Sequence, residues 1–176
     1  MAVSMDVIKE LRELTSCGVG DCKKALEETN GDIQKAKEIL QKRGLEIAAK
    51  KAGRMAKEGR VEAYVHLGSK IGVLVEVNCE TDFVARSEKF TQFTKDLALQ
   101  IVASDPKYIR RDQIPTEILG QQSHPEEFIK TVCLLEQPFI KDPKMTIQDY
   151  MNSLVASIGE NISINRFVRY KVGEGE

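Results

Sequence analysis

The sequence lacks several features that would assign it to a common functional class. No apolar run approaches the ~20 residues that a membrane-spanning helix needs, and the first residues lack the regions of a secretory signal. The 26 basic and 27 acidic residues nearly cancel, leaving a formal net charge of -1, so no global field attracts nucleic acid. We therefore expect a cytoplasmic protein with no membrane and no direct nucleic-acid partner, and a mature organellar protein stays open as an alternative.

Motifs for catalysis and metal binding are also missing. The sequence contains no phosphate-binding loop, dinucleotide fingerprint or nucleophile elbow. The four cysteines lack zinc-ligand spacing, and cysteine often behaves as a small buried hydrophobe; they are Cys17, Cys22, Cys79 and Cys133. We expect no enzyme activity, no metal and no cofactor, and a protein–protein module fits better.

Residues 1–44 predict a compact bundle of three short amphipathic helices. Ser4 and Asp32 are expected to cap the first and third helices, and Gly44 is expected to end the third. Asn30 and Gly31 both tolerate positive φ and should end the second helix. The apolar positions are Val7, Ile8, Leu11 and Leu14, then Cys22, Ala25 and Leu26, then Ile33, Ala36, Ile39 and Leu40. Small bundles of this kind usually bind another protein.

Residues 45–59 form a basic, alanine-rich stretch that is helix-prone and predicts a solvated helical linker. From residue 60 to residue 176 we expect a core domain with a small antiparallel sheet. Residues 61–79 alternate with a period of two and predict a β-hairpin with one buried face. Its apolar positions are Val61, Ala63, Val65 and Leu67, then Val73, Val75, Val77 and Cys79.

Helical spacing returns after Ser87, with Phe90, Phe93, Leu97 and Ile101 on one face. Further helices are expected over 126–135 and 147–158, and a final strand over 162–172. Helices packed on one face of a small antiparallel sheet define the α+β class. The sequence therefore predicts an α+β core preceded by a helical bundle and linker.

The run Glu80-Thr81-Asp82-Phe83-Val84-Ala85-Arg86 lies where a predicted strand passes into a predicted helix. Binding residues concentrate on loops held by a rigid scaffold, so an aromatic ring here can enter a pocket of a partner. Spacing alone leaves a second interpretation open, in which Phe83 folds back into the core.

The chain resembles the bacterial elongation factor Ts family, the nucleotide exchange factors of elongation factor Tu. The resemblance rests on five ordered blocks, which are residues 11–15 with 21–27, residues 48–52, residues 72–86, residues 135–139 and residues 158–162. The sequence departs from the family pattern at Val19-Gly20, where bulkier apolar residues are usual. Between Gly120 and Phe128 it is also shorter than family members usually are.

The resemblance implies a fold, a partner and two sets of contact residues. The bundle would be ubiquitin-associated-like, and its contact residues would be Arg12, Val19 and Gly20, named here the N-terminal contact set. Thr81, Asp82, Phe83 and Val84, named here the wedge segment, would act beside the magnesium and phosphate site of elongation factor Tu. GDP release without covalent chemistry would follow, and a homodimer through the core sheets is plausible. The alternative is an adaptor that binds the ribosome or a ubiquitin-like protein through the bundle alone.

Overall fold

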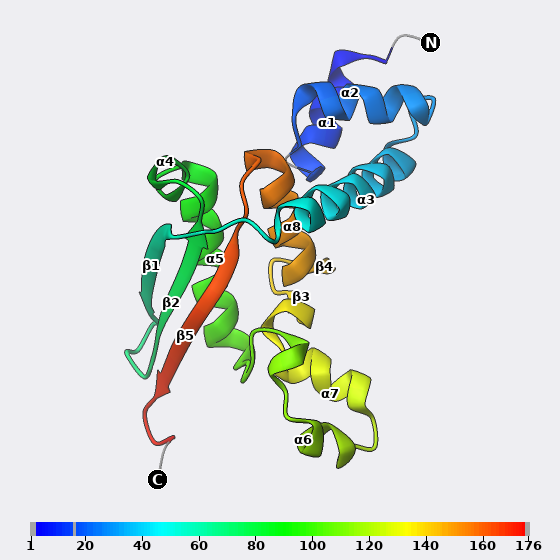
Figure 1. Ribbon diagram of the computed structural model, residues 1–176. Coiled ribbons are helices and arrows are strands. Elements are labelled where there is room, and N and C mark those ends of the chain that lie inside the picture. Colours follow the sequence, from blue (N-terminus) through cyan, green and yellow to red (C-terminus); the bar gives the residue numbers. More distant parts are fainter. Residues whose placement is uncertain (1–2, 16, 175–176) are drawn as a thin grey trace. The chain divides into compact units, whose positions relative to one another are not determined.

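The computed structural model describes residues 3–15 and 17–174, which Figure 1 shows as a ribbon. The chain divides into two compact units. Unit 1 contains Met1–Met55 and Met151–Asn161, and unit 2 contains Ala56–Tyr150 and Ile162–Glu176. Both units draw on two separate stretches of sequence, so neither is a simple N-terminal or C-terminal half.

Unit 1 is built on three helices, α1 (Met5–Thr15), α2 (Val19–Glu28) and α3 (Ile33–Lys51). Their apolar faces meet in one core, with partly buried Val7, Ile33 and Ile39 around it. The buried members of this core are Ile8, Leu11, Cys22, Ala25, Leu26, Ala36 and Leu40. Burial of these stripes supplies the main stabilisation, because short isolated helices are marginal in water.

The predicted ends of these helices are confirmed at the connection of α2 to α3. Asn30 and Gly31 adopt φ of 54° and 87°, the left-handed conformation that ends a helix. The Asp32 carboxylate accepts a hydrogen bond from the Lys35 backbone N–H at 3.0 Å, and this bond lowers the pKa of Asp32. A capping carboxylate satisfies a backbone donor that the first helical turn leaves unpaired.

The prediction that Gly44 ends the third helix is wrong, because α3 continues to Lys51. Gly44 is buried, and a Cβ built there would lie 3.7 Å from the Ala156 Cβ and 3.8 Å from the Asn152 carbonyl oxygen. Residues 151–158, the last part of α8 (Ile147–Ile158), therefore pack against α3 at this position and leave room for about a methyl group. The Lys51 amine donates to the Gly159 carbonyl and holds the same segment near the end of α3.

Unit 2 is built on an antiparallel sheet of β1 (Glu58–Val65), β2 (Ile71–Cys79) and β5 (Ser163–Lys171), in the order β1-β2-β5. Helix α5 (Glu88–Ser104) lies along one face of these strands (Figure 1). Ser87 caps α5 by accepting from the Phe90 N–H at 3.4 Å, as predicted. The buried residues of this layer include Val73, Val75, Val77, Phe90, Phe93, Leu97 and Ile101.

The prediction of one apolar buried face is correct for β2 and wrong for β1. Tyr64 pairs with Val73, and Val65 pairs with Gly72. Directly paired residues share a face of the sheet, so half-buried Tyr64 lies on the inner face and exposed Val65 on the outer one. The apolar alternation of β1 therefore faces away from α5, because the hairpin register decides which face each residue takes.

A second small sheet was absent from the expectations. It pairs β3 (Pro138–Phe139) with β4 (Asp142–Thr146). Two buried residues of α5 hold it: the Asp96 carboxylate accepts from the Lys141 amine at 2.6 Å, and the Gln100 side-chain oxygen accepts from the Ile140 N–H at 2.9 Å. Two-residue strands carry too little periodicity to be read from sequence.

The remaining elements complete the α+β class that the sequence predicts. Between α5 and β3 lie α6 (Thr116–Gly120) and α7 (Pro125–Val132), with 3₁₀ turns at Arg111–Gln113 and Leu134–Glu136. Ile114, Ile129 and Cys133 form their small core, and burial raises the pKa of the Cys133 thiol. Over residues 3–15 and 17–174, no helix combines the length and apolar character that crossing a bilayer requires.

Candidate partner-binding site

The wedge segment lies where β2 ends and α5 is about to begin. Thr81 is the N-cap of the one-turn helix α4 (Asp82–Ala85), and its hydroxyl accepts from the Val84 N–H at 3.3 Å. The buried Cys79 thiol donates to the Thr81 carbonyl oxygen at 3.1 Å, and the Ala85 N–H donates to the same oxygen at 3.2 Å. These bonds tie the turn to the end of a central strand, which fixes the direction of its exposed side chains.

Phe83 points into solvent, with 82% of its surface exposed. The next residue, Val84, is buried at 7% exposure, and Ala85 is buried at 8%. The interpretation of Phe83 as a core residue is therefore wrong. Val84 and Ala85 anchor α4 in the core, and this anchoring leaves a large aromatic ring presented on a short, well-attached turn.

Asp82 and Arg86 flank Phe83 and form an ion pair across the single turn of α4. Both side chains are largely exposed, so water screens the pair and it contributes little to stability. Asp82 is also in the first turn of α4, where its charge matches the positive end of the helix. The chemistry offered here is an apolar ring beside a carboxylate, which suits binding rather than catalysis.

The N-terminal contact set lies at one end of the bundle in unit 1. Arg12 is in the last turn of α1, Val19 is the first residue of α2, and Gly20 follows it. All three are exposed. Leu14 is exposed at the same end, although its spacing predicts a core position. All three thus lie next to the connection between α1 and α2, and exposed Leu14 is an aliphatic side chain there that sequence reasoning missed.

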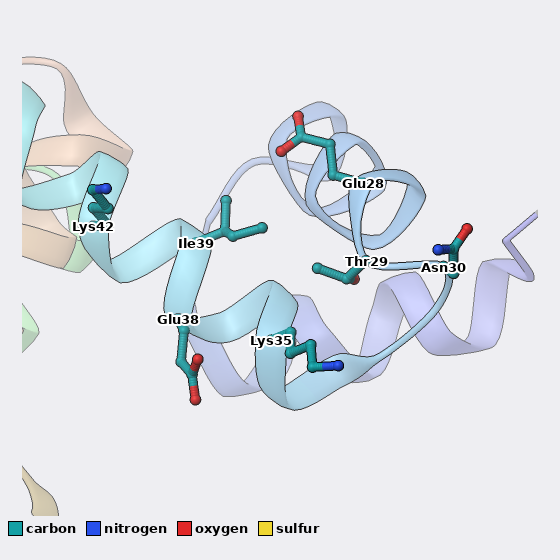
Figure 2. Close-up of a pocket in the computed structure, with 7 residues that line it drawn as sticks. All are labelled: Glu28, Thr29, Asn30, Lys35, Glu38, Ile39 and Lys42. Atoms are coloured by element: carbon teal, nitrogen blue, oxygen red, sulfur yellow. The ribbon is translucent and has the colours of Figure 1, made fainter.

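A separate pocket of about 500 Å³ lies between the end of α2 and the first half of α3 (Figure 2). Its lining is Glu28, Thr29, Asn30, Lys35, Glu38, Ile39 and Lys42. The mixture of amines and carboxylates has no single charge preference, and Arg43 already pairs with Glu28 at 2.7 Å. None of the residues predicted to contact a partner lies in this pocket.

The described residues hold no group of three or more His, Cys, Asp or Glu side chains that could bind a metal ion. Burial raises the pKa of the Tyr150 hydroxyl. Tyr150 stacks on Phe139 and donates to Asp96 at 3.0 Å, so this shift belongs to the packing of unit 2 and indicates no reactive group.

Comparison with known proteins gives one consistent similarity. The sequence model of the family described as Elongation factor TS matches residues 7–125 and 122–174. Three similar curated proteins are each named Elongation factor Ts. The protein of Carboxydothermus hydrogenoformans is 50% identical over 98% of this chain and 90% of the relative. That of Geobacter sulfurreducens is 46% identical over 99% of this chain and 92% of the relative. That of Acetivibrio thermocellus is 52% identical over 98% of this chain and 91% of the relative.

These alignments also support the predicted shortening between Gly120 and Phe128. They run over 196 to 198 positions, whereas the chain has 176 residues, so the relatives carry residues that this chain lacks. The two matched segments meet at residues 122–125. In the structure this is the short connection between α6 and α7, far in sequence from both sets of predicted contact residues.

Proposed function

Because the chain belongs to the elongation factor Ts family and is therefore a translation elongation factor, we propose that it releases GDP from elongation factor Tu as a guanine-nucleotide exchange factor. The observation that carries this proposal is the presentation of Phe83, which is 82% exposed on a turn anchored by buried Val84. A large ring held in solvent by its own scaffold is suited to a partner's pocket.

The proposed mechanism is a wedge that does not need to touch the nucleotide. Phe83 enters an apolar pocket near the magnesium site of elongation factor Tu, and Asp82 contacts the same region. Phosphates and Mg²⁺ are held by groups whose positions are set in advance, so small displacements weaken their binding. Burying a phenylalanine contributes roughly 1.5–3 kcal/mol, and this energy opposes the partner's hold on GDP.

Thermodynamic linkage then determines the order of binding. If the factor weakens GDP binding, GDP weakens binding of the factor by the same free energy. The pathway therefore passes through a complex without nucleotide, from which GTP displaces the factor. No bond is formed or broken in this chain, so it is an exchange factor and not an enzyme in the usual sense.

Arg12, Val19 and Gly20 form the second contact in this proposal, on a helix of the partner's nucleotide-binding domain. The C-terminal core would brace another domain of elongation factor Tu. A wedge acts most effectively when further contacts fix its position. The N-terminal contacts supply affinity, and the wedge segment supplies the displacement.

We further propose that two copies pair through the outer face of the β1-β2-β5 sheet. Large aliphatic and aromatic side chains are exposed on this face or at its edges; they are Val61, Val65, Leu67, Leu74, Val168 and Tyr170. Ala63, Leu74 and Val168 form one row across the three strands, and Val65, Gly72 and Tyr170 form the next. A continuous exposed apolar surface of this kind marks an interface, and two such faces can pack as a sandwich.

The test of the exchange function is release of the fluorescent analogue mant-GDP from elongation factor Tu, with wild type, Phe83→Ala and the control Met55→Ala. Met55 is another exposed apolar residue, outside both contact sets. Phe83→Ala should slow release by about one to three decades, as expected for an aromatic anchor, with an unchanged melting temperature. Normal release by this variant would contradict the wedge, and no acceleration by wild type would favour the adaptor alternative.

A further inference from the structure

The last turn of α1 has an unexpected arrangement. Leu14 continues the apolar spacing of α1 but is 53% exposed. Thr15 occupies the inward position instead, since its hydroxyl donates to the Leu11 carbonyl oxygen at 2.7 Å and lies 3.8 Å from the Cys22 sulfur. The four-residue step from Leu11 to Thr15 follows the inner face of the helix, and this step turns Leu14 outward.

A second exposed aliphatic residue lies across the turn from Leu14. Val19 is 45% exposed and begins α2, so Leu14 and Val19 border the same connection between α1 and α2. Met5, another exposed apolar residue of unit 1, begins α1 and lies about 14 Å away along the helix axis at 1.5 Å per residue. The two aliphatic side chains are therefore a local feature of one end of the bundle.

Gly20 contributes no apolar surface here. A Cβ built on it would meet nothing within 4 Å, so this part of the turn is open space. Arg12, in the last turn of α1, places a cation at the same end. Leu14 and Val19 thus supply the aliphatic area, and the complementary surface is an apolar patch with a carboxylate beside it.

We propose that Leu14 is an affinity-determining contact for elongation factor Tu, acting together with the N-terminal contact set. This inference rests on the proposed exchange function and deepens it, because it names a residue that sets affinity for the partner. Leu14 belongs to unit 1 and Phe83 to unit 2. Replacing Leu14 should therefore change how much factor is needed, and leave the release rate at saturation unchanged.

The experiment compares Leu14→Ala and Leu14→Lys with Leu45→Ala, a control at a 49% exposed leucine in the middle of α3. Release of mant-GDP is measured over a concentration series of each factor, and binding to nucleotide-free elongation factor Tu is measured by calorimetry. Leu14→Ala should raise the half-saturating concentration and the Kd about fivefold, and Leu14→Lys more than about tenfold. The saturating rate, the melting temperature and the Leu45→Ala control should not change.

Each alternative outcome is decisive. Wild-type affinity in both Leu14 variants would overturn the inference and leave the exchange function intact. A lowered melting temperature that accounts for the lost affinity would also overturn it, since Leu14 would then be structural. If wild type binds elongation factor Tu without releasing GDP, the exchange function fails, while the Kd series still tests Leu14. If wild type does not bind at all, both proposals fail.

Discussion

The side chains of Asp82 and Phe83 are neighbours, but they would act through different physics. Transfer of the exposed Phe83 ring from water to an apolar pocket lowers the free energy of the complex. The exposed Asp82 carboxylate, by contrast, already interacts with water and with Arg86 in the free protein. Polar contacts that water partly replaces contribute modestly. We expect Asp82→Ala to slow GDP release by less than about tenfold, clearly less than Phe83→Ala.

Asp112→Ala is the matched control for Asp82→Ala, because Asp112 is also exposed and also pairs with a nearby arginine, Arg110. Both variants are compared by mant-GDP release at several salt concentrations, since salt screens contacts between exposed charges. If Asp82→Ala slows release as much as Phe83→Ala, the carboxylate is an equal part of the wedge and the difference proposed here is wrong.

At this scale, sequence reasoning located Phe83 but did not determine its direction. An aromatic residue between a strand and a helix can point into the core or into a partner. The spacing of apolar residues in the sequence is the same in both cases and does not distinguish them. The choice is made by Thr81 and Val84, whose capping bond and burial set the orientation of α4. Exposure of Leu14 was missed for a related reason, since Thr15 takes the inward position beside Cys22 of α2, and the spacing within α1 does not contain that contact.

At the scale of elements, α3 contains a buried glycine in its interior. Gly44→Ala should stabilise unit 1 by up to ~1 kcal/mol, because alanine is the better helix former and its Cβ would make ordinary contacts at 3.7 and 3.8 Å. Gly44→Leu should instead destabilise it by roughly 1–3 kcal/mol, as overpacking does. The measurement is thermal unfolding followed by circular dichroism.

Gly20 provides the control for this pair of changes, because it is also helical but faces open space. Both Gly20→Ala and Gly20→Leu should be tolerated, which separates helix propensity from packing against residues 151–158. Equal stabilities of Gly44→Ala and Gly44→Leu would mean that the close approach at Gly44 does not constrain its side chain.

Element prediction succeeded where local chemistry decides and failed where tertiary contacts do. The caps at Asp32 and Ser87 are local, and both are confirmed. Gly44 has the composition of a helix stop, yet packing near Ala156 keeps it inside α3. The outward face of β1 depends on the register that pairs Val65 with Gly72, and no pattern within β1 contains that information.

For the whole molecule, the outer face of the three-stranded sheet predicts the oligomeric state. Leu74→Lys and Val168→Lys place a charge in the middle of this exposed apolar surface, and a buried unpaired charge is strongly unfavourable. We expect wild type to sediment as a dimer and both variants as monomers, without loss of folding. Ile140→Lys, at an exposed isoleucine next to the β3–β4 pair, is the control and should sediment as wild type does.

Analytical ultracentrifugation over a range of concentrations gives the dimer dissociation constant for each variant. A monomeric wild type at tens of micromolar, or dimers that tolerate both charges, would contradict pairing through this face.

The class of fold was predictable because a period of two and a period of 3.6 occupy separate stretches of sequence. Which sheet face stays uncovered was not, because that depends on where α5 packs.

Unit 1 is built from two separate stretches of sequence, so it cannot be completed during translation until residues 151–161 have been synthesised. Gly44 leaves the ribosome well before Ala156, whose Cβ lies 3.7 Å from a Cβ built at Gly44 in the finished fold. At about 5–20 residues per second, the roughly 110 intervening residues take roughly 5–20 s to translate. During that time the nascent α1–α3 bundle has its own core but an uncovered strip on α3, which residues 151–158 cover once they have been synthesised.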